Sequence, residues 1–164
     1  MSRFFCLVVC LAFVGCSNQK YEGTNNKAGD ELNKGKGFYD KQDYKTAISC
    51  YTEAIRLDPD LALAYSNRGA AYLGLGKNDE VIRDCSEAIK LDPDLAMAYS
   101  NRAAAYLYLG KYDEGIRDCS EAIKLNPNLA QAYYNRGFGY NKKGDPEKAK
   151  VDFEMAKKLG FPRQ

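Results

Sequence analysis

The sequence predicts an all-α protein built as a solenoid of repeated helix pairs, and three observations support this prediction. Residues 61–94 and 95–128 are identical at 27 of 34 positions without a gap. Apolar residues recur at helical spacing within each unit, and no long run alternates between apolar and polar residues. Glycine and proline recur between these segments at the same period. Because a repeat of about 20–50 residues buries its apolar face only against its neighbours, such chains are typically binding scaffolds rather than catalysts.

Each repeat is expected to hold two helices. The first helix of the second unit is indicated by residues at helical spacing, namely Tyr65, Gly69, Tyr72 and Leu75. It is expected to end at Gly76, where a left-handed C-terminal cap is needed. The second helix should end before Pro93, because proline cannot continue a helix. In the last unit Pro146 comes early in the second helix, where its missing N–H costs nothing.

Small and large residues recur in register along the chain. The units begin at Ala28, Ala62, Ala96 and Ala130. The matching sets are Gly35, Gly69, Ala103 and Gly137; Phe38, Tyr72, Tyr106 and Tyr140; Ala54, Ala88, Ala122 and Ala156; and Pro59, Pro93 and Pro127. In this register residues 28–161 resemble the tetratricopeptide repeat (TPR) family. The resemblance implies a right-handed α-solenoid of four helix-turn-helix repeats, at 28–61, 62–95, 96–129 and 130–163.

Two departures from the family pattern concern packing. Cys85 and Cys119 stand where the outer repeats have an aromatic residue. A disulfide needs Cα atoms within about 7 Å, whereas packed helices of adjacent repeats lie about 10 Å apart, so we expect buried free thiols. Gly115 stands where the outer repeats have alanine, and because glycine costs a helix roughly 0.5–1 kcal/mol against alanine, Gly115→Ala is expected to stabilise the protein.

The first 15 residues form a different kind of sequence. After Arg3 comes a run of a dozen uncharged residues, too short to span a bilayer and of the size of a signal-peptide core. The run meets polar sequence at Gly15-Cys16-Ser17, which resembles the lipobox of bacterial lipoproteins. The resemblance implies cleavage after residue 15, lipidation of Cys16, and an outer-membrane lipoprotein facing the periplasm. The alternatives are an ordinary secretory signal or a short retained anchor. Residues 16–27 are expected to be a flexible tether.

Composition excludes several classes of function. Without residues 1–15 the chain has 23 basic and 22 acidic residues, since only Arg3 is lost from 24 and 22. No basic run exceeds two residues, so nucleic-acid binding is not expected. The chain has no histidine, the commonest general base and metal ligand. Residues 74–77 resemble part of a phosphate loop but lack the following Ser/Thr. We therefore expect no enzyme activity, no metal and no cofactor other than covalent lipid.

The candidate binding site is the concave groove that the first helices of TPR repeats line. An asparagine recurs there in every unit, and its amide can pair with the backbone of an extended peptide, as donor and acceptor. The asparagines are Asn33, Asn67, Asn101 and Asn135. Pockets for apolar side chains are expected around them, from Leu63, Met97, Ala70, Ala104, Tyr108, Tyr134 and Phe138. The alternative is that the asparagines only satisfy neighbouring backbone groups.

TPR co-chaperones that hold the C-terminal carboxylate of heat-shock proteins resemble this chain, including its YSNR stretch at 65–68. Of the clamp positions, only Asn67 matches. Leu32 and Met97 replace lysines, Lys36 replaces an asparagine and Asn101 replaces an arginine. Capture of a terminal carboxylate in that manner is therefore not expected.

These features favour a lipid-anchored adaptor that binds a protein or an extended peptide, by class resemblance in envelope or pilus assembly. The alternatives are a soluble cytosolic co-chaperone and a non-catalytic subunit of an enzyme complex. Arginine and aspartate that recur at one position of each helix pair are expected to form ion pairs; they are Arg68, Arg102, Arg136, Asp84, Asp118 and Asp152. The C-terminal end, with Phe153 and Phe161, is expected either to pack on its own repeat or to dock a partner, including a second copy in an isologous dimer.

Overall fold

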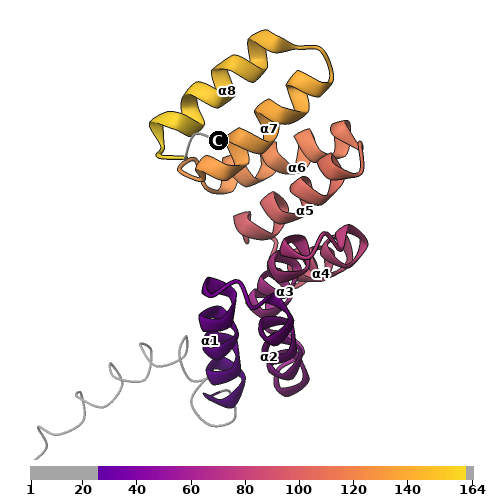
Figure 1. Ribbon diagram of the computed structural model, residues 1–164, viewed down its shortest axis with the longest axis vertical. Helices are drawn as coiled ribbons and strands as arrows, with labels where there is room; N and C mark the ends of the chain where they lie inside the picture. Colours follow the sequence, from indigo (N-terminus) through magenta and orange to yellow (C-terminus); the bar gives the residue numbers. More distant parts are fainter. Residues whose placement is uncertain (1–25, 162–164) are drawn as a thin grey trace, which may run out of the picture.

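The computed structural model describes residues 26–161, and this part of the chain is all-helical. Within this part, eight helices follow one another as four antiparallel pairs, stacked from α1 and α2 at one end to α7 and α8 at the other (Figure 1). The helices are α1 (Asn26–Asp40), α2 (Tyr44–Leu57), α3 (Ala62–Gly74), α4 (Asn78–Leu91), α5 (Ala96–Tyr108), α6 (Tyr112–Leu125), α7 (Ala130–Lys142) and α8 (Pro146–Lys158). The predicted solenoid of helix pairs is confirmed, and no strand occurs within residues 26–161.

The ends of the helices follow from local chemistry. Asp43 and Asp145 accept hydrogen bonds from backbone N–H groups of the first turns of α2 and α8. The residues that end the second helices are extended where a proline follows, as Asp92 is before Pro93. α1 begins at Asn26, inside the segment expected to be a tether. No helix among residues 26–161 is both long and apolar enough to span a bilayer.

The turn within each pair requires a backbone with positive φ. Gly76, Gly110 and Gly144 hold this position in the last three repeats, with φ of 70°, 74° and 81°. Gln42 holds it in the first repeat, with φ of 61°. A side chain in this region costs roughly 1–2 kcal/mol, so the first turn carries strain that the other three avoid.

Small residues let the two helices of a pair approach closely. A Cβ added at Gly69 would lie 2.7 Å from Cys85 Sγ, and one added at Gly137 would lie 2.9 Å from the Phe153 ring. Cys85 and Cys119 are fully buried free thiols, as predicted, and Cys50, the third cysteine within residues 26–161, is also a free thiol. Burial raises the pKa of the Cys85 thiol to about 12, which keeps it protonated at neutral pH.

The surroundings of Gly115 argue against the expectation that Gly115→Ala stabilises the protein. A Cβ there would lie 2.7 Å from Cγ and Cδ2 of Leu107, and 3.2 Å from the Ala103 carbonyl oxygen. Leu107 is 5% exposed. It also lies against α7, because a Cβ added at Gly139 would come within 3.0 Å of its Cδ2. The glycine at 115 is therefore a packing requirement: it accommodates a leucine that links α5, α6 and α7.

Candidate functional site: the inner helix layer

The first helices of the pairs form one layer along the solenoid. α1, α3, α5 and α7 contact each other in succession, and within residues 26–161 the second helices make no comparable contacts among themselves. Closer spacing of one layer curves the stack toward it. The first helices therefore line the concave side, as the family resemblance implied.

Each first helix contributes one stripe of four residues to the concave side, and these residues are spaced four, three and four apart in the sequence. The stripes are Gly29, Asn33, Lys36 and Asp40; Leu63, Asn67, Ala70 and Gly74; Met97, Asn101, Ala104 and Tyr108; and Gln131, Asn135, Phe138 and Lys142. Exposed apolar side chains gather in the two middle repeats, where Leu63 is 47%, Met97 42% and Tyr108 78% exposed. The stripes of the first and last repeats are more polar. The concave surface is thus apolar at its centre, with a lysine in the stripe at each end.

The four asparagines do not have equal roles. Asn33 is exposed and Asn67 is half-buried, so both amides can reach a ligand. Asn101 is 4% exposed and its Nδ2 donates to the Ser66 carbonyl oxygen at 3.4 Å, which joins α5 to α3. At this position the alternative is confirmed: the asparagine satisfies a neighbouring backbone group. Asn135 is half-buried, and its Nδ2 has no partner among the described residues.

Two aromatic residues expected in the groove behave differently. Tyr134 stacks on Phe161, with ring centroids 4.5 Å apart, and lies 5.5 Å from Phe153. Its ring therefore closes the C-terminal repeat and is already engaged within the chain. Phe138 stays partly exposed on the inner stripe, with Lys142 Nζ 5.4 Å from its ring centroid. Of the two, only Phe138 can contribute to a groove contact.

An ion pair that recurs in the last three repeats fixes how far the first helix of each pair is shifted along the second. Each arginine makes a bidentate contact with the aspartate of its own repeat. Arg102 Nε donates to Asp118 Oδ2 at 2.7 Å, and its Nη2 donates to Oδ1 at 3.0 Å. The same contacts join Arg68 to Asp84 and Arg136 to Asp152, so the predicted pairing is confirmed. These pairs are largely buried, because the aspartates are 2–9% exposed and the arginines 16–21%. Removing one partner of such a pair would therefore leave a largely buried charge unpaired, which costs more than breaking a surface pair does.

Each arginine also reaches the preceding repeat, which the sequence reasoning missed. Arg68 Nη1 donates to Thr52 Oγ1 at 3.1 Å, Arg102 Nη1 to Ser86 Oγ at 3.0 Å, and Arg136 Nη1 to Ser120 Oγ at 3.4 Å. The signal in the sequence was the recurrence of a hydroxyl at 34-residue spacing. Burial acts to lower the pKa of Arg102, but its hydrogen bond and attraction to Asp118 outweigh this and raise it. The cation is thus held firmly at the junction of two repeats.

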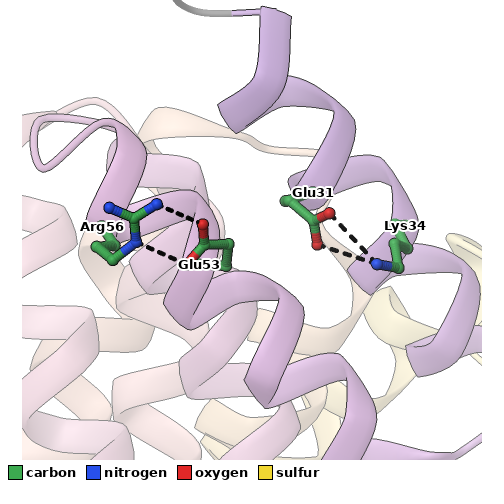
Figure 2. A network of polar contacts seen from close by, with 4 residues as sticks. All are labelled: Glu31, Lys34, Glu53 and Arg56. Atoms are coloured by element: carbon green, nitrogen blue, oxygen red, sulfur yellow. Dashed lines mark hydrogen bonds and ion pairs between the residues drawn. The ribbon is translucent and has the colours of Figure 1, made fainter.

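The first repeat lacks this network. Lys34 stands at the arginine position, and Cys50 at the aspartate position. Figure 2 shows that Lys34 pairs instead with Glu31 of its own helix, at 3.3 Å, while the Glu53–Arg56 pair lies separately on α2. The cation of Lys34 is therefore not held between two helices.

The remaining residues singled out in the sequence are placed as follows. Leu32 packs against the core of the first repeat and Asn101 is buried, so two former clamp positions do not face a ligand. Ala70 and Ala104 lie on the inner stripes, with Ala104 nearly covered. Cys16, the predicted lipidation site, and residues 1–15, the predicted signal peptide, lie outside the described residues.

Profiles of one family match most of this chain. A profile described as TPR repeat matches residues 35–76. Profiles described as tetratricopeptide repeat match residues 62–95, 96–129 and 119–151. The chain belongs to the tetratricopeptide repeat family.

Several named proteins are similar to part of this chain. It is 40% identical over 58 residues to the Protein STIP1 homolog of Dictyostelium discoideum, which covers 35% of this chain and 10% of that protein. It is 44% identical over 57 residues to Hsp70-Hsp90 organizing protein 3 of Arabidopsis thaliana, covering 35% of this chain and 10% of that protein. The chain thus spans about a tenth of the length of these two relatives.

Among solved structures, the second TPR domain of human RPAP3 in complex with an HSP70 peptide aligns with a TM-score of 0.67 and 35% identity. That alignment covers 71% of this chain and 98% of the RPAP3 domain. The crystal structure of MamA aligns with a TM-score of 0.70 and 27% identity, over 82% of this chain and 73% of MamA. TPR domains are protein-interaction scaffolds, and this chain has their architecture.

Proposed function

We propose that the protein is an adaptor that binds an extended peptide segment across the inner stripes of α3 and α5. The observation that carries this proposal is the exposure of Leu63, Met97 and Tyr108 on two adjacent stripes. Large apolar side chains clustered on one surface are typical of binding sites. The accessible amides of Asn33 and Asn67 pair with the peptide backbone, which holds the segment extended. Apolar side chains of the ligand supply most of the affinity.

The groove is tested with a Leu63→Glu, Met97→Glu double variant, used as bait in detergent-solubilised membranes. Burying a methionine or leucine side chain contributes about 1.5–3 kcal/mol, so we expect partner capture to fall at least about tenfold. Val151→Glu is the matched control, because Val151 is 64% exposed on α8 and lies outside the inner layer. Recovery of the same partners at the same level by the double variant would show that the groove is not the binding site.

The ligand is not recognised through a terminal carboxylate. Two of the clamp lysines and the clamp arginine are replaced by Leu32, Met97 and Asn101, and the last of these is buried. A peptide taken from a captured partner should bind equally well with a free or an amidated C-terminus in a titration. Loss of binding on amidation alone would contradict this part of the proposal. It would also favour the second candidate function, a cytosolic co-chaperone. This candidate is supported by the similarity to the Hsp70-Hsp90 organizing proteins.

We further propose that the adaptor is tethered to the outer membrane, facing the periplasm, through lipid on Cys16. The support is the position of Cys16, directly after an apolar run and directly before polar sequence. Mass spectrometry should find an acylated cysteine as the mature N-terminus, and Cys16→Ser should release the protein from membranes. Cys10→Ser is the control and should leave fractionation unchanged. A protein that keeps Met1 and fractionates with the cytosol would exclude the anchor.

The partner is expected among proteins of envelope assembly, because the tether would hold the groove at the membrane surface. If the partner proves to be an enzyme that co-purifies in fixed ratio, the chain is its non-catalytic subunit. Identification of the proteins lost from the Leu63→Glu, Met97→Glu capture separates these two outcomes.

A further inference from the structure

The two ends of the solenoid each present a face that no other described helix covers. At one end α8 borders a hollow of about 310 Å³, whose lining includes Ala149, Phe153 and Glu154. At the other end α1 exposes polar side chains around Gly37, and a Cβ added at this glycine would meet no atom within 4 Å. α1 and α8 lie at opposite ends of the stack (Figure 1).

Inside the stack, the second helix of one repeat always meets the first helix of the next in the same register. Three contacts of one kind show this: Arg68 to Thr52, Arg102 to Ser86 and Arg136 to Ser120, each 16 residues apart. A second kind of contact joins Lys143, directly after α7, to Asp113 of α6. In both kinds a cation on the first helix, or directly after it, meets an acceptor on the helix before it.

The residues that would continue this register past each end of the stack are found by counting whole 34-residue periods from the observed contacts. One period after Ser120 comes Glu154, and one period before Arg68 comes Lys34. For the second kind of contact, the position one period after Asp113 is Glu147, and the position three periods before Lys143 is Lys41. All four are exposed. α8 therefore presents anions at both acceptor positions, and the two donor positions, on α1 and directly after it, both hold cations.

Two further matches support the same alignment. A Cβ added at Gly139 of α7 would lie 2.8 Å from Ile116 of α6, so glycine permits close approach at this junction. Gly37 is the equivalent of Gly139 on α1. One turn beyond Lys34 on α1 is Asp30, and one turn beyond Glu154 on α8 is Lys157, which again have opposite charges.

We propose that a second copy of this chain docks its α1 on the outer face of α8, so that the solenoid continues from one molecule into the next. The contact pairs Lys34 with Glu154, Lys41 with Glu147 and Asp30 with Lys157, around Gly37 and the hollow beside Phe153. Such a contact joins two different surfaces and can extend into a short filament. It differs from an isologous dimer, in which two antiparallel α8 helices centred on the hollow would set Lys150 of each copy against Lys157 of the other.

Charge reversal at the two ends tests the contact in the full-length chain, in non-ionic detergent, by sedimentation velocity. The wild type should grow beyond a dimer as its concentration rises towards about 1 mM, and less so at high salt. Lys34→Glu and Glu154→Lys should each weaken association about tenfold or more. Both residues are exposed, and the Lys34–Glu31 pair that one variant loses is a surface pair worth about 0–1 kcal/mol. Each variant should therefore keep the helical content of the wild type and a thermal midpoint within a few degrees of it.

Mixing the two variants gives the decisive result. The altered α1 of the Lys34→Glu variant is complementary to the altered α8 of the Glu154→Lys variant, and the unaltered ends still fit each other. The mixture should therefore associate as strongly as the wild type, and so should the double variant alone. If the chains associated through an isologous α8 contact, Lys34→Glu would leave association unchanged. If they associated through residues 1–25, both substitutions would leave it unchanged. Either of these patterns, or a wild type that stays monomeric at every concentration, overturns the proposal.

Discussion

Replacement of Gly115 by alanine sets two opposing effects against each other. In a helix interior alanine is favoured over glycine by about 0.8–1.0 kcal/mol. In this structure the new methyl carbon would lie 2.7 Å from Leu107 Cγ and Cδ2, too close for van der Waals contact. Leu107 cannot simply rotate away, since it is 5% exposed and held between α6 and Gly139 of α7. Overpacking of this kind typically costs about 1–3 kcal/mol.

The expected net effect is a loss of about 1 kcal/mol, which in a domain of this size lowers the thermal midpoint by roughly 3–4 °C. Thermal unfolding followed by circular dichroism measures it. Gly37→Ala is the matched control, because it lies in α1 with open space around its Cβ position. That variant should gain about 0.5–1 kcal/mol.

A double-mutant cycle identifies the cause. With Leu107 replaced by alanine the two closest atoms are gone and only the Ala103 carbonyl oxygen, at 3.2 Å, stays near the new methyl group. Gly115→Ala should then stabilise the protein through its helix propensity. The reasoning is refuted if Gly115→Ala in the wild-type background raises the midpoint as much as Gly37→Ala does. That result would mean that Leu107 repacks freely, and that the glycine is not required for the contact between α5 and α6.

Three other predictions concern the ion pairs, the thiols and the first turn. Asp118→Ala should cost about 3–5 kcal/mol, because it leaves the largely buried Arg102 unpaired, whereas Glu121→Ala, which removes an exposed pair with Lys124, should change the denaturation midpoint little. Cys85 and Cys119 should resist alkylation at pH 8 in the native protein and react only on unfolding, as mapped by mass spectrometry; since the pKa of Cys85 is raised from 9.0 to about 12, the stability that this thiol contributes is present below pH 9 and lost as the pH rises towards 12, and a Cys85→Ala variant should lose less over that range. Gln42→Gly should stabilise the protein by about 1 kcal/mol by relieving φ of 61°, and Gly76→Ala should cost a similar amount; an unchanged midpoint in both would show that the turns carry no strain.

The sequence alone determined the helices, their order and the pairing of arginine with aspartate. These features depend on residues that recur in register, and a period of 34 brings the same local interactions back in each unit. The match of Arg68, Arg102 and Arg136 with the aspartates 16 residues later needed only the equal heights of two antiparallel helices. Gly69 belongs to the same recurring pattern, and in the structure it lies closely against Cys85.

Only the tertiary structure decided which of the equivalent residues are accessible, because accessibility depends on neighbours that differ from repeat to repeat. Asn67 and Asn101 occupy the same position, yet Asn101 is buried and bonded to the Ser66 carbonyl while Asn67 remains half-exposed. Tyr134 was expected in the groove, but it belongs to the C-terminal aromatic packing because the ring of Phe161 stacks on it. A repeated sequence sets the same backbone each time, but the side chains pack against whichever repeat lies above and below, and these are not the same at the middle and at the ends.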